Sequence, residues 1–496
     1  MRNLPSHIGM RMEDTLIHPI TEHPVVECNI FDFGKGGLLS MQHEIEGSIF
    51  GAMPLELEDG EFINETIEDF FDYYKNKRIK YEPLTWQQVV MEKADDTSMG
   101  LPLGAKFADH GCFKEAYDGD FDLLYEDLQQ AEDDILEGCA PISVWKCLPK
   151  EDKYSRKKIE ARRFRLVSIG SYVLLCICRR WLSQVDSYIK DLIQQFHVLG
   201  TNEMYEKHVL SRLISRYSLG VDYTAFDKNS GRTFVTTSIQ FLDFMSNYQT
   251  PRKIIEYIIL NISNPVTILP SKDGEHLVYN LSGTNPSGQL FTTSVNSVTH
   301  LLHNCVILRR VYRISVRDYL ADLSMLRSAM TGDDGLETCE TKEQTMLVVS
   351  MLARKVAEYF GIPAKVEGLT NHKTGALEPY PLDVMAPYLS EVCVLRYQEG
   401  YYYRFPCNPK RMLARLIFVP EDKMSKMSEL MPSRCQNIAH ELHSLTVHET
   451  LNVDIPQNTT LKRMHDYIRQ NRVILKSPQD VGDRVFMIPK GQITIS

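Results

Sequence analysis

The sequence predicts an α+β fold in which an antiparallel sheet carries a tight hairpin and is backed by helices. The hairpin is indicated by Thr331-Gly332-Asp333-Asp334-Gly335, which lies between the apolar-leaning run 325–330 and Leu336. Asp-Gly is a favoured turn dipeptide because both of its residues can adopt φ > 0. The tip of the hairpin would present two neighbouring carboxylates. Helices are indicated by apolar patterning in four segments: 181–217, 231–262, 290–311 and 342–360.

The composition is that of a globular protein, and its charges are segregated. A chain of 496 residues with 43% hydrophobic and 24% charged residues predicts two or three structural units. The net charge of −10 argues against a nucleic-acid partner only as an average, because residues 146–165 contain nine basic side chains against three acidic ones. Aromatic side chains lie among these cations, as in a phosphate-binding ribbon, and a solvated charged face is the alternative.

Cysteine usage and hydropathy indicate an intracellular protein that does not span a membrane. The eleven cysteines show no CxxC spacing, and the closest pair, Cys176 and Cys178, lies in an apolar run. We expect reduced, buried thiols and no zinc site. The N-terminus has no apolar signal core, and the longest apolar run, Val167 to Cys178, is too short to cross a bilayer. We therefore expect no transmembrane segment.

The first half of the chain leads to a pair of aspartates. Residues 97–104 form a small-residue loop, and the basic strip passes into the apolar, partly β-branched segment 165–178. After the first helical segment, residues 220–227 read as a short strand running into a turn. If a helix begins after Ala225, Asp222 and Asp227 can lie on the same side of the strand end. One such Asp alone is more typical of a cap or a turn.

The second half places a polar helix before the hairpin. Residues 266–279 read as a hairpin, and the turn-forming loop 282–289 precedes the helix at 290–311. On that helix Thr292, Asn296 and Thr299 recur on one face, and the glycine-containing loop before them favours a ligand-facing stripe over one that bonds its own backbone. Beyond the hairpin we expect a helix at 342–360, a strand at 364–369, a hairpin at 392–405 and a mostly helical C-terminal unit.

These pieces together favour nucleotidyl transfer. Two carboxylates from different strands, Asp222 and Asp333, would hold a pair of Mg²⁺ ions, which prefer oxygen ligands and keep positions for water and phosphate. Metal ions ~4 Å apart activate an attacking hydroxyl and stabilise the leaving oxygen of an in-line displacement. The basic ribbon would bind a triphosphate, and the polar stripe would contact a ribose.

The motifs and their order resemble those of viral RNA-dependent RNA polymerases of the picornavirus-like, positive-strand type, over about residues 90–410. TSMGLPLG is similar to the template-binding motif, and KEDKYSRKKIEARRFRLV to the basic nucleotide-binding motif. GVDYTAFD, SGTNPSGQLFTTSVNS and TGDD are similar to the three motifs of the family's palm. Three departures are Thr331, where the family usually has tyrosine, Tyr154, where arginine is common, and VLRY at 394–397 in place of Phe-Leu-Lys-Arg.

The resemblance implies a right-hand polymerase whose fingers and thumb close into a ring. The palm would be a small antiparallel sheet that carries the hairpin, with Asp222 on a neighbouring strand. The implied domains are fingers at 1–180, palm at 181–234, a fingers insertion at 235–286, palm at 287–390 and thumb at 391–496.

The resemblance also assigns roles to residues of this sequence. Asp222 and Asp333 would be the metal ligands for Mg²⁺ or Mn²⁺, with Asp334 in support. The group that senses the ribose 2′-hydroxyl would comprise Asp227, Ser287, Gly288, Thr292 and Asn296.

Further roles are implied outside the palm motifs. Lys150, Lys158 and Arg165 would contact the triphosphate, with Arg163 as a rival for Arg165. A lysine after the hairpin would act as general acid, and Lys373 in its loop is preferred over Lys365 in a strand. The template and primer would contact Thr97, Ser98, Gly100 and Arg396.

The implied activity is template-directed addition of nucleoside triphosphates (NTPs) to an RNA 3′ end during viral genome replication. Partners would be template and primer RNA, NTPs, a small protein primer and other viral replication proteins. The expected location is the host cell cytoplasm at replication complexes, or the virion. The alternatives are a reverse transcriptase and a non-catalytic RNA-binding protein on a polymerase fold; the SGTNPSG loop and Asn296 argue against the first, and the full set of carboxylates against the second.

Overall fold

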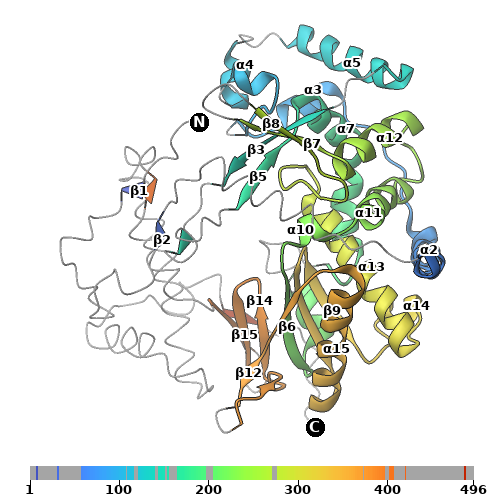
Figure 1. Ribbon diagram of the computed structural model, residues 1–496, viewed down its shortest axis with the longest axis vertical. Helices are drawn as coiled ribbons and strands as arrows, with labels where there is room; N and C mark the ends of the chain where they lie inside the picture. The colour runs from blue at the N-terminus through green and yellow to red at the C-terminus, as the bar shows by residue number, and fades with distance from the viewer. Residues whose placement is uncertain are drawn as a thin grey trace.

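A computed structural model describes most of the chain between residues 57 and 406 (Figure 1). The described ranges are 57–95, 97–107, 109–116, 121–139, 143–150, 154–155, 165–196, 205–270, 276–371, 374–396 and 401–406, together with the short strands at 7–8, 31–32, 419–420 and 485–487. The predicted helical C-terminal unit therefore lies outside the described residues.

The central feature is a four-stranded antiparallel sheet. Its strand order is β11 (Ala364–Glu367), β6 (Tyr217–Tyr223), β10 (Asp334–Cys339) and β9 (Arg327–Thr331). Since β9 and β10 are consecutive and antiparallel, they form the hairpin that the sequence indicated. In the register of the sheet, Asp334 lies opposite Asp222 of β6.

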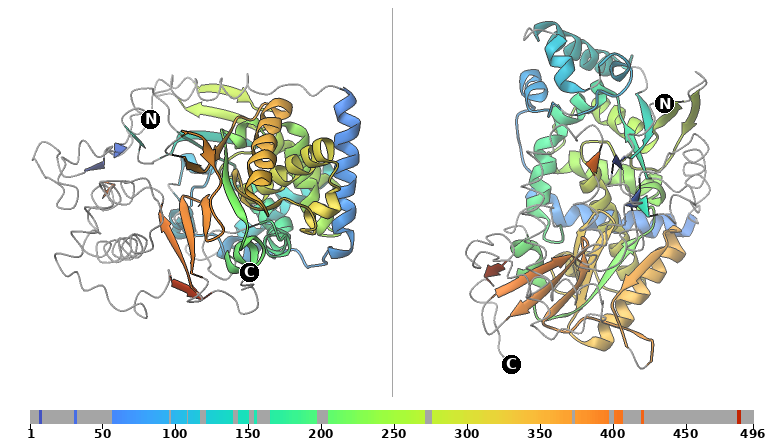
Figure 2. Two further views of the ribbon diagram at one scale, coloured as in Figure 1. Left: turned by 90° about the horizontal axis from the view of Figure 1, so that it is seen from below. Right: turned by 90° about the vertical axis from the view of Figure 1, so that its left-hand side faces the viewer.

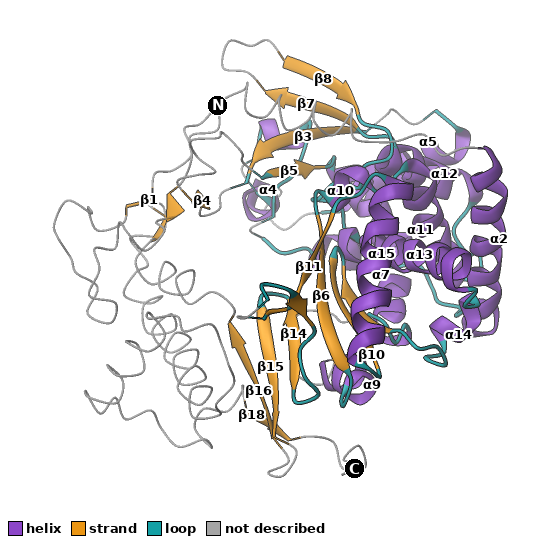
Figure 3. Ribbon diagram, turned by 60° about the horizontal axis from the view of Figure 1, so that its bottom comes forward, coloured by secondary structure: helices purple, strands orange, loops and turns teal. Residues whose placement is uncertain are grey.

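This sheet is covered on both faces. Alternate side chains such as Val221 and Met330 join the main core beneath α13 (Thr292–Tyr312) and α15 (Lys342–Phe360). On the opposite face, Ala329 and Leu336 pack with residues of a second sheet. Figure 3 shows the helices on one side of the central sheet and the second sheet on the other. The second sheet has the order β14 (Val384–Tyr388), β15 (Glu391–Arg396), β16 (Tyr401–Pro406) and β18 (Val485–Met487).

A third four-stranded sheet lies beyond one end of the central sheet, at the top of Figure 1. Its strand order is β5 (Leu166–Ile169), β3 (Val144–Pro149), β7 (Val266–Pro270) and β8 (His276–Asn280), with β3 and β7 parallel. The β7–β8 pair is the hairpin predicted at 266–279. The described two-stranded pairs are β1 (His7–Ile8) with β17 (Val419–Pro420), β2 (Phe31–Asp32) with β4 (Tyr154–Ser155), and β12 (Leu369–Thr370) with β13 (Leu377–Glu378).

Helix α2 (Leu57–Tyr74) lies along the outer side of the helical layer, where it contacts α11, α13 and α14 (Figure 2). The remaining described helices are η2 (Lys75–Lys77), α3 (Trp86–Met91), η3 (Leu103–Ala105), α4 (His110–Ala116), α5 (Asp122–Glu137), α7 (Tyr172–Leu192), the π-helix η4 (Glu206–Leu210), α9 (Ser211–Leu213), α10 (Phe226–Asn229), α11 (Arg232–Met245), α12 (Arg252–Ser263) and α14 (Val316–Leu320).

Two predicted helical segments have different limits in the structure. The predicted limits of the helix at 181–217 were wrong at both ends. The Ser171 side chain accepts a hydrogen bond from the Leu174 amide and so caps the start of α7, and Tyr217 already belongs to β6. The segment at 231–262 is two helices. Asn247 and Tyr248 adopt positive φ after α11, and Pro251 then starts α12.

The hairpin turn differs from the predicted one by its position. Thr331 pairs with Asp334, so the two turn residues are Gly332 and Asp333, and Asp334-Gly335 already belongs to the strand. Gly332 has a φ of 64° while Asp333 does not adopt positive φ. A turn with glycine at its first central position matches the twist of a hairpin as well as an Asp-Gly turn does. The turn therefore forms at Gly332-Asp333, two residues before the Asp-Gly dipeptide.

The expectations for the cysteines and for membrane spans can be compared with the structure only within the described residues. Cys176 and Cys178 are buried in α7, as predicted, and the described cysteines are free thiols. No helix within the described ranges is long and apolar enough to cross a membrane.

Candidate active site

The acidic residues meet at the end of the central sheet. Asp334 and Asp222 are direct partners across β10 and β6, so their side chains project from the same face. Asp333 lies at the tip of the adjacent turn. Asp222 and Asp333 are exposed and Asp334 is partly exposed, whereas most of the sheet around them is buried. This is the open end of an otherwise covered sheet.

These carboxylates share an electrostatic environment that disfavours their charged forms. Protein surrounds the Asp333 side chain on most sides although it reaches solvent, and this desolvation raises its pKa to about 6, with a contribution from the charge of Asp222. Burial and then repulsion from Asp333 and Asp222 raise the pKa of Asp334 to about 7. Desolvation and the charge of Glu367 raise the pKa of Asp222. A bound cation would stabilise the charged forms of carboxylates that are desolvated and repel one another.

Asp227 approaches the same site from α10, the short helix that follows β6. Ala225 adopts a left-handed conformation after the strand, and α10 begins at Phe226. The chain therefore turns where the sequence indicated. Desolvation raises the pKa of Asp227, while the positive charges of Lys228 and Arg165 oppose the rise. Asp227 in turn contributes to the raised pKa of Asp333, so the two aspartates are near enough to interact.

The loop before α13 is organised by Asn285, a buried residue that the sequence reasoning missed. Its backbone amide donates to the Asp227 carbonyl at 2.7 Å. Its side-chain nitrogen donates to Asn296 Oδ1 at 2.7 Å and to the Thr292 carbonyl at 3.1 Å, and its Oδ1 accepts from Gln289 Nε2 at 2.6 Å. Asn285 thus connects three predicted ribose-site residues. Its only signal in the sequence was its place in a loop of turn-forming residues.

Ser287 and Gly288 bring this loop against the third sheet. Ser287 Oγ accepts a hydrogen bond from the Ser168 amide of β5 at 3.2 Å. A Cβ atom on Gly288 would lie 1.9 Å from the Ser168 carbonyl oxygen, so only glycine permits this approach of the two backbones. Thr292 Oγ1 donates to the carbonyl oxygens of Pro286 and Gln289 at 3.0 Å each, which closes the loop onto the helix.

The predicted polar stripe on α13 is only partly directed to this loop. Asn296 and Thr292 belong to it, but Thr299 is fully buried and its hydroxyl lies 2.9 Å from Ser238 Oγ on α11. The expectation of a ligand-facing Thr299 was wrong because the stripe turns into the contact between α13 and α11.

Of the predicted triphosphate ligands, Lys150 and Arg165 are described. The Lys150 amide donates to the Arg165 carbonyl at 2.7 Å, which places the two residues side by side at the ends of β3 and β5. Arg165 is exposed and its charge acts on both Asp227 and Asp333. Lys158 and Arg163 lie outside the described residues.

The loop at residues 97–104 packs under the start of α7. A Cβ atom on Gly100, which has positive φ, would lie 1.8 Å from the Gly170 carbonyl oxygen. Thr97 Oγ1 donates to the Ala94 carbonyl at 2.6 Å, and the Gly100 amide donates to Ser98 Oγ at 3.4 Å. Ser98 is exposed and Thr97 partly exposed, so this loop still offers polar side chains to a ligand.

Of the two lysines that are candidates for the general acid, only Lys365 lies within the described residues. Lys365 on β11 lies directly opposite Asp222, and its ammonium group pairs with Glu367. That pair raises the pKa of Lys365. The preferred candidate, Lys373, lies outside the described residues, as does the side chain of Arg396 at the end of β15.

Thr331, the residue before the hairpin turn, is buried and contacts the second sheet. Its Oγ1 lies 2.7 Å from the hydroxyl of Tyr388 on β14. The sequence has threonine where a tyrosine was expected from the resemblance. A tyrosine hydroxyl, that of Tyr388, nevertheless contacts this position from β14.

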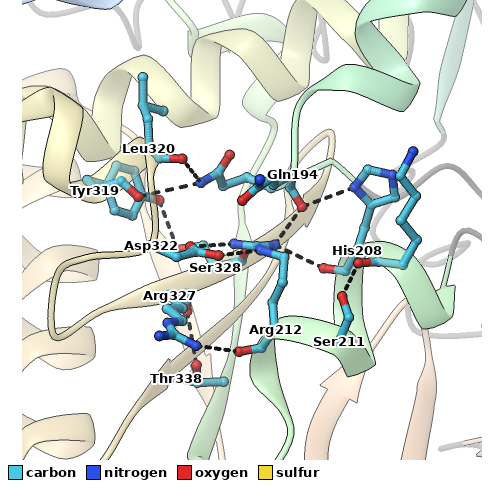
Figure 4. A network of polar contacts seen from close by, with 12 residues as sticks. Gln194, His208, Ser211, Arg212, Tyr319, Leu320, Asp322, Arg327, Ser328 and Thr338 are labelled. Carbon is cyan, nitrogen blue, oxygen red and sulfur yellow. Dashed lines mark hydrogen bonds and ion pairs between the residues drawn. The ribbon is translucent and has the colours of Figure 1, made fainter. Parts of the chain in front are cut away.

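The strand that leads to the turn is held from behind by Arg212 on α9 (Figure 4). Its guanidinium donates to both carboxylate oxygens of Asp322, at 2.5 and 2.7 Å, and to the Ser328 carbonyl of β9 at 3.0 Å. Further bonds reach the carbonyls of Gln194 and His208, at 2.5 and 2.9 Å. Because the Arg212 and Asp322 side chains are almost entirely buried, this bidentate pair is shielded from water.

The donor set suits a divalent cation that prefers oxygen ligands. Asp222, Asp333 and Asp334 supply carboxylates only, and their mutual repulsion would be relieved by a bound cation. In the part of the chain that the structure describes, no three His, Cys, Asp or Glu side chains are already gathered closely enough to hold a metal ion.

The fold, with carboxylates at the open end of an antiparallel sheet backed by helices, is that of an α+β polymerase. Residues 68–421 match the family described as viral RNA-dependent RNA polymerase, which is more than half of the chain, and the protein therefore belongs to this family. No curated protein matches the sequence. The family makes the protein an RNA-directed RNA polymerase, a nucleotidyltransferase that uses an RNA template, NTPs and divalent metal ions, and not a reverse transcriptase.

Proposed function

We propose that this polymerase replicates the RNA genome of a picornavirus-like virus by two-metal, template-directed transfer of nucleotides to an RNA 3′ end. The observation that carries the proposal is the pairing of Asp334 with Asp222 at the open end of the sheet, with Asp333 at the adjacent tip. Carboxylates on neighbouring strands and on the turn beside them supply the oxygen ligands that a pair of Mg²⁺ ions, or Mn²⁺ ions, prefers.

In this mechanism Asp222 and Asp333 hold the cations and Asp334 supports them. When bound, the cations would activate the RNA 3′ hydroxyl and stabilise the leaving oxygen of pyrophosphate. Arg165, with Arg163 as its rival, and Lys150 attract the triphosphate to the start of β5, and Lys158 adds a further positive charge. Neutralisation at this point keeps the nucleotide beside the carboxylates rather than repelled by them.

The ribose would be recognised by the group around the loop before α13. Asn285 bonds the backbone carbonyls of Asp227 and Thr292 and the side chain of Asn296, while Ser287 Oγ accepts a hydrogen bond from the Ser168 amide. These bonds hold the segments that carry the group in fixed positions. A fixed hydrogen-bonding group discriminates against a sugar that lacks its partner, because the site is then left with an unpaired polar group. This supports selection of ribonucleotides over deoxyribonucleotides.

Two lysines are candidates for the general acid that protonates pyrophosphate. Lys373 remains the preferred candidate, because the sequence places it in a loop after the hairpin. Lys365 is supported by its register, because it lies directly opposite Asp222. Comparing Lys365→Leu with Lys373→Leu in the pH profile of the rate would separate them.

The domains proposed are fingers at 1–180 with an insertion at 235–286, palm at 181–234 and 287–390, and thumb at 391–496. The antiparallel pair of β1, near the N-terminus, with β17, in the proposed thumb, supports a ring closed between fingers and thumb. We further propose that Thr97, Ser98, Gly100 and Arg396 contact template or primer. A protein primer and other replication proteins would be partners at cytoplasmic replication complexes or in the virion.

The proposal is tested by primer extension with purified protein, Mg²⁺, a template–primer RNA and NTPs. Asp222→Asn and Asp333→Asn remove one metal ligand each without changing side-chain size. Because charge stabilisation of the transition state is lost, the rate of extension should fall about 100-fold or more. Removal of Mg²⁺ with a chelator should stop extension by the wild-type protein.

The matched control is Asp127→Asn, the same substitution on the exposed surface of α5. It should extend RNA at the wild-type rate, and all variants should bind template–primer RNA and unfold at similar temperatures. Wild-type activity that persists in Asp333→Asn would contradict the two-metal assignment. Efficient incorporation of deoxyribonucleotides would contradict the proposed ribose site.

A further inference from the structure

His300 lies on α13 one turn beyond Asn296, beneath the hairpin turn. Its side chain is completely buried, and Nδ1 is 3.1 Å from the carbonyl oxygen of Gly332. Because a carbonyl can only accept a hydrogen bond, Nδ1 must carry the proton. Burial lowers the pKa of His300 to about 4, so the ring is neutral at physiological pH and is held in this one tautomer.

Ser297, three residues earlier on the same face of α13, contacts the other polar group of Gly332. The Gly332 amide donates to Ser297 Oγ at 2.8 Å. Both backbone groups of this one residue are therefore bonded by side chains of α13. Gly332 directly precedes Asp333 and has positive φ, so these two bonds determine where the first residue of the turn sits and how the chain leaves it.

The ring of His300 also contacts the strands and the turn that carry the other acidic residues. It packs edge-on against Tyr223, with ring centroids 4.9 Å apart, and lies 5.8 Å from the ring of Phe226. A Cβ atom on Gly335 would lie 3.1 Å from His300 Cε1, so the ring reaches β10 as well. The four residues that His300 approaches are the sequence neighbours of the four acidic residues: Tyr223 of Asp222, Phe226 of Asp227, Gly332 of Asp333 and Gly335 of Asp334.

We propose that His300, assisted by Ser297, is the positioning residue of the active site and holds the segments carrying the four aspartates in register. The inference rests on the proposed function of those aspartates. Its physical basis is that one rigid ring, buried and hydrogen-bonded, contacts all the segments from which they project. Asn296 is adjacent to Ser297 on α13, so ribose recognition and the placement of the metal ligands depend on the same helix.

The test compares variants that differ in a single contact. His300→Asn and His300→Leu have side chains of similar shape, and both remove the ring, but only Asn keeps a donor near the position of Nδ1. Ser297→Ala removes the bond to the Gly332 amide. Thr299→Val is the matched control, because it removes a buried hydroxyl of α13 that contacts Ser238 and not the hairpin. Asp333→Asn serves as the inactive reference.

For each variant we would measure kcat, the KM for NTP and the Mg²⁺ concentration for half-maximal extension. Two further measurements do not depend on activity: RNA affinity in a chelator, and the rise in Tm caused by Mg²⁺ with template–primer RNA and a nonhydrolysable NTP. Partners that orient metal ligands typically contribute 10- to 100-fold to metal affinity or activity.

Ser297→Ala and His300→Leu should therefore lose about tenfold or more in kcat and require more Mg²⁺, with unchanged RNA affinity. His300→Asn should recover part of the loss relative to His300→Leu, because it keeps a donor for the Gly332 carbonyl but lacks the ring. Thr299→Val should match the wild type in kcat and Mg²⁺ dependence.

The proposal would be overturned if Ser297→Ala kept the wild-type kcat and Mg²⁺ dependence, or if Thr299→Val lost as much as Ser297→Ala. Equal losses in His300→Asn and His300→Leu would also refute the role of the hydrogen bond. If the histidine variants did not fold, Ser297→Ala against Thr299→Val would decide. If the wild-type protein did not extend RNA, the proposed function would fail, and the Mg²⁺-dependent rise in Tm of Ser297→Ala would still decide the role of the hairpin contacts.

Discussion

At the scale of single residues, the contact between Asn285 and Asn296 is the one on which the proposed ribose site most directly depends. Asn285 Nδ2 donates to Asn296 Oδ1, and both residues are buried. The contact fixes which end of the Asn296 amide faces the loop. A side-chain amide that can rotate freely offers either a donor or an acceptor, and it then discriminates poorly between two sugars.

Asn285→Ala should therefore weaken the preference for ribonucleotides. We expect the ratio of kcat/KM for GTP to that for dGTP to fall about tenfold, the equivalent of one hydrogen bond of about 1.4 kcal/mol. The measurement is single-nucleotide addition on a template with cytosine at the first position. Asn280→Ala, at an exposed position of β8, is the control. An unchanged ratio in Asn285→Ala would show that Asn296 is oriented by other contacts.

At the scale of secondary-structure elements, Arg212 joins α9 to β9 and to the turn after α14. Its guanidinium is bonded to Asp322 and to three backbone carbonyls, and these partners come from segments more than 100 residues apart. Strand β9 is also bonded on its outer edge, where the Met330 amide donates to the Gln195 carbonyl at 2.7 Å. The hairpin strand is thus anchored before it reaches the turn at Gly332 and Asp333.

Arg212→Ala should destabilise the protein strongly. The substitution removes the guanidinium that pairs with the Asp322 carboxylate and bonds the Ser328 carbonyl, and removal of one partner from a buried pair costs about 3–5 kcal/mol. Arg212→Lys should recover little of this, because an ammonium group cannot make the bidentate contact. The measurement is the free energy of unfolding in urea. Arg252→Ala, which breaks an exposed pair with Glu256, should change it little, and equal effects of the two substitutions would contradict this account.

At the scale of the whole molecule, the central sheet contains acidic groups whose charged forms oppose folding. Glu337 on β10 is completely buried between α13 and β9, where it accepts hydrogen bonds from Ser328 Oγ and, at 3.3 Å, from Asn304 Nδ2. Burial raises its pKa from 4.5 to about 7. The folded state therefore retains this proton over a pH range in which the unfolded chain has released it.

Glu337 should make stability depend on pH in a defined direction. Its contribution is fully present below pH 4.5 and is lost as the pH rises through about 7. Glu337→Gln keeps a neutral side chain at every pH, so the stability of this variant relative to wild type should rise from pH 5 to pH 8, by about 3 kcal/mol at most. The measurement is the difference in Tm at each pH, with Glu343→Gln as the surface control for the change in charge. A difference that is constant or falls with pH would contradict the buried, protonated carboxyl.

The sequence by itself determined the features that depend on near neighbours in the chain. The turn before Asp334, the strand that ends at Asp222 and the helix that follows the loop at 282–289 all come from local patterns. Turn-forming residues and apolar periodicity act over a few residues, so they can be recognised from the sequence alone. The same locality explains the errors at 181–217 and at the turn dipeptide, where a capping serine and a glycine two residues earlier set the boundaries.

Only the tertiary structure decided which distant residues meet. The register that places Asp334 and Lys365 on either side of Asp222, the contact between Asn285 and Asn296, and the position of His300 beneath the hairpin join segments that no local pattern relates. His300 is one polar residue on a helix that is buried on almost every side, so its spacing does not distinguish it from a core histidine. Its role depends on which backbone groups pack against it, and packing fixes them only when the sheet and α13 come together.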